Sequence, residues 1–65
     1  MQIRVKFSQF DGYWVAEAEN GAVSQGETLD DCRDNIRAAI RDLAEHEEKE
    51  HPVLSEKVEV LEVVL

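Results

Sequence analysis

Several features that would mark a particular class of protein are missing or scarce in this chain. A single cysteine, Cys32, excludes an intrachain disulfide, and with no secretory signal it predicts a reducing, cytoplasmic location. No apolar run approaches the roughly 20 residues that a membrane-spanning helix needs, so we expect no membrane association. Cations are also few: 7 Lys and Arg face 15 Asp and Glu, a formal net charge of −8. Because phosphate backbones are bound by clustered cations, we expect no direct contact with nucleic acid.

The spacings that enzyme and metal sites need are absent as well. Gly12, Gly21 and Gly26 are typical of turns and do not form a phosphate-binding loop. The serines have no His and acidic partners arranged as a visible triad. His46 and His51 would point to different faces of a helix, whereas zinc ligands on one helix normally lie four residues apart. We therefore expect no enzyme, no cofactor and no metal.

The first third of the chain has the patterns of β-strands. Residues 2–10 alternate between polar and apolar side chains, which predicts a half-buried strand. Asp11-Gly12 is a strong hairpin turn, and the aromatic and β-branched residues of 13–18 predict a second strand. A turn over residues 19–21 leads to a short third strand at 22–25.

The hairpin turn also predicts how the first two strands pair. A two-residue turn at Asp11-Gly12 places Phe7 opposite Ala16 and Val5 opposite Ala18, whereas a three-residue loop would swap the two faces on one strand. The first face of the sheet then carries the apolar set Ile3, Val5, Phe7, Trp14, Ala16 and Ala18. The second face carries a small apolar patch of Phe10, Tyr13 and Val15 beside Glu17.

An amphipathic helix follows the third strand. Thr28 can cap its first turn, and Asp31 stands where the second member of a capping box would be. Apolar residues then recur every three or four positions, at Leu29, Cys32, Ile36, Ala39, Ile40 and Leu43. Cys32 lies on this stripe, which favours a buried core thiol over a reactive nucleophile. Pro52 predicts that the helix ends at or before His51.

A last strand is predicted over residues 58–65, with apolar side chains on both of its faces. Val58, Val60 and Val64 share one face, while Leu61 and Val63 share the other. The predicted fold is therefore a single α+β domain over residues 1–65, of order β-β-β-α-β. We expect a mixed four-stranded sheet of order 3-2-1-4, with the last strand parallel to the first and the helix packed on one face.

The helix would leave the opposite face of this sheet bare. We predict a partner or oligomer surface there, made of Phe10, Tyr13, Val15, Glu17, Leu61 and Val63. A chain of 65 residues has a marginal core, so self-association is a plausible source of stability. A homodimer or a higher homo-oligomer is therefore expected.

Part of the chain resembles a known family. Residues 11–17 (DGYWVAE), residues 23–32 (VSQGETLDDC), Asn35-Ile36 and Ala39-Ile40 are together similar to the N-terminal domain of HicB-type antitoxins. The resemblance covers about residues 1–44. It implies a partial RNase H-like fold and direct binding of a HicA-type toxin, a small basic mRNA-cleaving protein. An acidic antitoxin suits a basic toxin electrostatically.

The chain also departs from the pattern of that family. Family members carry a longer segment with Pro-Gly between the second and third strands, where only residues 19–22 stand here. They also continue into a C-terminal DNA-binding domain, which we do not expect here. The alternative is an orphan homo-oligomeric domain with a structural or regulatory role and no toxin partner.

Overall fold

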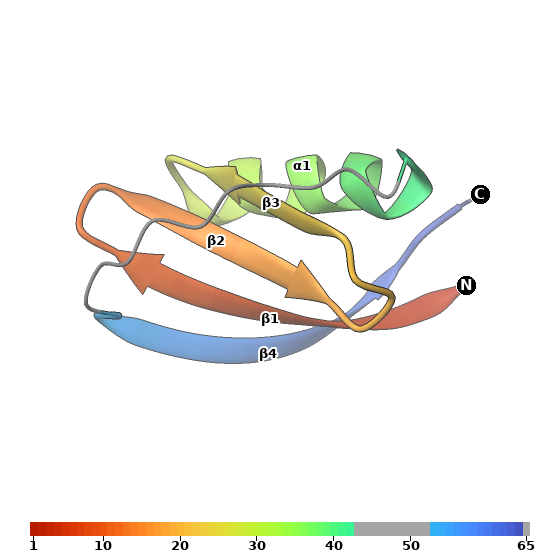
Figure 1. Cartoon of the computed structure of the whole chain (residues 1–65), viewed down its shortest axis with the longest axis horizontal. Coiled ribbons are helices and arrows are strands. Elements are labelled where there is room, and N and C mark those ends of the chain that lie inside the picture. Colours follow the sequence, from red (N-terminus) through yellow and green to blue (C-terminus); the bar gives the residue numbers. More distant parts are fainter. Residues whose placement is uncertain (43–52, 65) are drawn as a thin grey trace.

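The computed structural model describes residues 1–42 and 53–64. Its elements are β1 (Gln2–Phe10), β2 (Tyr13–Ala18), β3 (Val23–Gly26), α1 (Leu29–Asp42) and β4 (Ser55–Glu62). The strands form one sheet of order β3-β2-β1-β4, and α1 lies along one side of it (Figure 1). The predicted element order and strand order are thus confirmed. Within these residues no helix is long and apolar enough to cross a membrane.

The β1–β2 hairpin has the predicted register. Phe7 lies opposite Ala16 and Val5 opposite Ala18, around the turn at Asp11-Gly12. Gly12 has a φ of +88°, a left-handed conformation that a side chain would disfavour. The turn therefore fixes the register locally, before any contact with the helix.

The direction of β4 differs from the prediction. β4 runs antiparallel to β1, with Arg4 opposite Val60, so the sheet is wholly antiparallel and not mixed. The prediction of a parallel strand came with a right-handed crossover from the third strand through the helix. Residues 43–54 can reach about 40 Å when extended. The longest dimension of the molecule is 32 Å, so chain length permits either direction.

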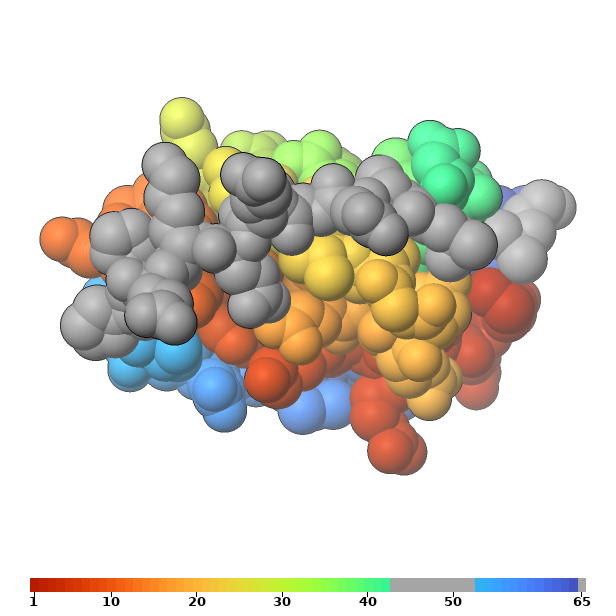
Figure 2. Space-filling view, in the orientation of Figure 1, coloured from red at the N-terminus to blue at the C-terminus, as the bar shows by residue number. Residues whose placement is uncertain are grey.

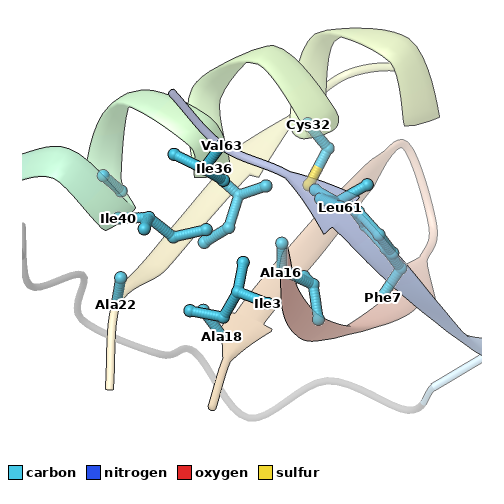
Figure 3. Close-up of a cluster of buried hydrophobic side chains, with 12 residues drawn as sticks. Ile3, Phe7, Ala16, Ala18, Ala22, Cys32, Ile36, Ile40, Leu61 and Val63 are labelled. Atoms are coloured by element: carbon cyan, nitrogen blue, oxygen red, sulfur yellow. The ribbon is translucent and has the colours of Figure 1, made fainter. Parts of the chain in front are cut away.

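The two faces of β4 also have roles opposite to those predicted. Leu61 lies opposite Ile3 on the helix side of the sheet, and Val63 follows it into the core. Leu61 is 4% exposed and Val63 0% exposed, so their assignment to an exposed surface was wrong. Figure 3 shows both side chains in the same cluster as Cys32 and Ile36.

The predicted helix start and apolar stripe are confirmed. The hydroxyl of Thr28 accepts a hydrogen bond from the backbone N–H of Asp31 at 3.1 Å, which satisfies one free donor of the first turn. The buried residues of α1 are Cys32, Ile36, Ala39 and Ile40, and they pack mainly over β3 and β2. Three predictions fall on residues outside the described ranges. They are the burial of Leu43, the end of the helix at or before His51, and the orientation of His46 relative to His51.

Gly26 has a role that the sequence pattern did not reveal. It is the last residue of β3, and a Cβ built on it would lie 2.5 Å from the backbone nitrogen of Cys32. Such a separation is shorter than van der Waals contact, and the neighbouring atom is backbone. Glycine therefore allows the first turn of α1 to pack directly against the end of β3.

We expect Gly26→Ala to destabilise the fold by about 1–3 kcal/mol, because the helix start must move away from β3. Urea unfolding monitored by circular dichroism measures the change. Gln25→Ala, at the exposed neighbouring position, is the matched control and should change stability by no more than about 0.5 kcal/mol. An equally stable Gly26→Ala variant would contradict the close approach.

Candidate binding surface

The side of the sheet away from α1 collects four of the six predicted surface residues. Phe10, Tyr13, Val15 and Glu17 share this side, as the β1–β2 register requires. The rings of Phe10 and Tyr13 are stacked, with centroids 5.2 Å apart and an angle of 14° between planes. Both rings and Glu17 are half-buried, and Val15 is only 7% exposed. The predicted patch is thus assembled, but Val15 is not open to a partner.

Apart from Met1, the large exposed apolar side chains of the described residues lie on β4 or close to it in sequence. Val58 and Val60, on the same side of the sheet as Phe10, are each 59% exposed. Val64 is 74% exposed, and Val53 and Leu54, which precede β4, are 44% and 62% exposed. The sequence analysis placed Val58 and Val60 on a common face but did not select that face as the accessible one.

The helix side of β4 carries charge, and α1 neutralises it. The guanidinium of Arg33 donates from Nε to Glu59 Oε1 at 2.9 Å and from one terminal nitrogen to Oε2 at 2.8 Å. The other terminal nitrogen donates to Asp30 at 2.7 Å. Such two-pronged pairing fixes both geometry and direction. The Arg33 guanidinium carbon also lies 6.0 Å from the centre of the Phe7 ring, within the range of a cation–π contact.

This pair lowers the pKa of Glu59 below its ordinary value of 4.5, chiefly because the Arg33 side chain donates hydrogen bonds to the carboxylate. Partial burial acts in the opposite direction. The positive charge of Arg33 and the nearby Lys57, whose Nζ lies 3.4 Å from Glu59 Oε2, add to the lowering. Glu59 therefore stays ionised on the side of the sheet that also buries Leu61.

Cys32 occupies the core position that the sequence predicted. Its side chain is 0% exposed, and burial raises the pKa of its thiol from 9.0 to about 11. A thiol in this state is a poor nucleophile, since the thiolate is the reactive form. Cys32 therefore contributes packing at the junction of α1 with the sheet.

Exposed acids surround the first half of α1. Glu27, Asp30, Asp31 and Asp34 are all exposed, with the side chains of Asp30 and Asp34 at 91% and 80%. The nearby cations are engaged: Arg33 with Glu59 and Asp30, and Arg37 with Asp34 at 3.5 Å. This part of the surface is consequently negative.

In residues 1–42 and 53–64, no group of three or more His, Cys, Asp or Glu side chains is placed to hold a metal ion. Comparison with family models, curated proteins and solved structures finds no match to this chain. The resemblance to HicB-type antitoxins therefore stays a prediction.

The lowered pKa of Glu59 predicts a specific pH dependence. Its carboxylate stabilises the fold above its ordinary pKa of 4.5, and that contribution is lost as the pH falls through the lower folded-state pKa. Glu59→Gln should therefore be less stable than the parent protein at neutral pH, and the difference should shrink on acidification. Denaturant unfolding at a series of pH values measures this.

Asp34→Asn is the control for that experiment, because it also turns a carboxylate into an amide but breaks only an exposed pair with Arg37. Its effect at neutral pH should stay within about 0.5 kcal/mol. A Glu59→Gln variant with the same stability as the parent at every pH would show that the Arg33–Glu59 ion pair does not stabilise the packing of α1 against β4.

The burial of Cys32 predicts slow modification. At mildly alkaline pH the folded protein should not react with a thiol reagent on the timescale in which a free thiol reacts completely. Adding denaturant should expose one equivalent of thiol. Rapid labelling without denaturant would show that α1 does not cover this position.

Proposed function

We propose that this chain is a protein-binding module of the HicB antitoxin type. It neutralises a small basic HicA-type mRNA-cleaving toxin by direct contact in the cytoplasm. The resemblance of residues 11–17 and 23–32 to that family suggests the class of partner. The element order β-β-β-α-β agrees with the fold that the resemblance implies.

The observation that carries the proposal is the unbalanced charge around α1. Glu27, Asp30, Asp31 and Asp34 are exposed. Arg33 pairs with Asp30 and Glu59, and Arg37 pairs with Asp34, so these two arginines do not balance the charges of Glu27 and Asp31. A surface of this kind attracts a basic protein and speeds its encounter at low salt. With a formal net charge of −8, the whole chain adds to the same field.

The motif that carries the resemblance also builds this acidic surface. In the string VSQGETLDDC, Gly26 lets the helix start approach β3 and Thr28 caps the first turn. Glu27 and Asp31 project from the same turn and are exposed. The segment thereby presents carboxylates on a rigid, capped helix start, where a partner's cations can reach them.

Co-expression with the small basic protein encoded beside this chain tests the function. We expect rescue of growth from the toxin and a complex that co-purifies, with affinity that falls as salt rises. If the neighbouring protein is toxic, and this chain neither rescues growth nor forms a complex with it, the proposed function is wrong.

Two charge-matched variants test the location. Glu27→Gln combined with Asp31→Asn should weaken toxin binding about tenfold, or about 1.4 kcal/mol. Glu56→Gln combined with Asp42→Asn changes the net charge equally at exposed positions outside the helix start, and should weaken binding less. Equal losses in both variants would show that net charge, and not the helix start, sets the affinity.

A further inference from the structure

β4 forms one outer edge of the sheet, and no strand in the described residues pairs with its far side. It spans 8 residues, whereas β3 at the opposite edge spans 4 and packs against α1. Long edges are templates for another strand, and short, covered edges are not. In Figure 2 the blue atoms of β4 line the lower margin of the molecule.

The free backbone groups of this edge belong to the even-numbered residues of β4. The N–H of Val63 donates to the carbonyl of Met1 at 2.8 Å. The backbone N–H and C=O groups of the odd-numbered residues of β4 therefore point toward β1. The N–H of Glu19 donates to the carbonyl of Arg4 at 3.0 Å, so the backbone groups of the even-numbered residues of β1 point toward β2. The odd-numbered residues of β1 are thus left to bond to β4, which agrees with the bond from Val63 to Met1. Since antiparallel ladders alternate, the outward N–H and C=O groups are those of Glu56, Val58, Val60 and Glu62.

We propose that β4 pairs antiparallel with β4 of a second copy of this chain, about a twofold axis at Val58. The paired sheets would form one continuous sheet, with the two helices on the same side and distant from the seam. This inference does not depend on a toxin partner. It uses the strand edge, and leaves the acidic start of α1 exposed.

Charge complementarity selects the second copy and the register. With Val58 opposite Val58, each Lys57 lies opposite Glu59 of the other copy. Lys57 and Glu59 then form a non-hydrogen-bonded pair, in which the two backbones exchange no hydrogen bond. Side chains are closest in such pairs. Opposite charges directly across an antiparallel pair are stabilising. The Lys57 side chain is 45% exposed and lies 3.4 Å from Glu59 of its own chain, so at the seam its ammonium group would stand between two Glu59 carboxylates.

The neighbouring registers are worse. Centring the pair on Glu59 would set Glu59 against Glu59 and Glu56 against Glu62, which places like charges directly opposite each other. Centring it on Val60 would set Lys57 against Val63 and so leave Lys57 without an acidic residue opposite. Charged residues on an edge strand normally discourage pairing. Here the register centred on Glu59 opposes like charges, and of these three registers only the one centred on Val58 pairs Lys57 with Glu59.

Cysteine cross-linking tests both the pairing and its register. In the proposed dimer the Cα atoms of the two Val58 residues are about 5.5 Å apart, within the range that a disulfide spans. The two Val60 residues are about 14 Å apart. Under mild oxidation Val58→Cys should therefore become a covalent dimer, and Val60→Cys should not. The two positions are matched, since each side chain is 59% exposed. The native Cys32 is buried and should not form the cross-link.

Light scattering on the unmodified chain should show a dimer at high micromolar concentration. Val58→Pro removes one outward N–H and should be monomeric but folded, because that group does not bond to β1. Lys57→Glu should raise the dimer dissociation constant about tenfold or more at low salt. A monomeric parent protein, or cross-linking of Val60→Cys as fast as of Val58→Cys, would overturn the proposal.

Discussion

The bidentate pair between Arg33 and Glu59 is the interaction on which the arrangement of this fold depends. The backbone of α1 packs over β3 and β2 and makes few contacts with β4. Arg33 spans that gap across Phe7 and joins the helix to the outer strand through two hydrogen bonds. With Glu59 held on the helix side, the strand's alternation places Leu61 in the core and Val60 outside.

The same constraint explains why β4 has two unlike faces. Its helix side combines buried Leu61 with the charged residues Lys57 and Glu59, while its other side presents Val58 and Val60. A strand that only completed the core would normally show polar residues outward. In Figure 1, α1 and β4 lie on opposite margins of the molecule. The acidic helix start and the strand edge are therefore separate surfaces.

Local chemistry made the first 42 residues largely predictable. The turn at Asp11-Gly12 sets the hairpin register, Thr28 caps the helix, and apolar residues at three- and four-residue spacing define its buried face. Each of these signals acts over a few residues, so a sequence pattern contains it. The predicted sharing of one face by Phe10 and Tyr13 followed from the same turn.

The direction of β4 and the close approach at Gly26 depend on contacts between distant segments. An alternation of period two has no direction, and both faces of residues 58–64 are apolar, so the pattern could not choose between them. The deciding partner of Glu59 lies 26 residues away, on the flank of the helix beside Cys32. Charge could not choose either, because Glu59 lies on one face and Glu62 on the other, and only the folded chain brings Arg33 to Glu59.

Nuclear Overhauser effects between Hα atoms test this account most directly, because such atoms are closest in the antiparallel pairs that lack mutual backbone hydrogen bonds. An antiparallel β4 should give strong Hα–Hα contacts between Arg4 and Val60 and between Lys6 and Val58, with the Leu61 methyl groups near Ile3. If these contacts are absent and the methyl groups of Val58 and Val60 instead contact α1, both the direction of β4 and the surface inferred from it are wrong.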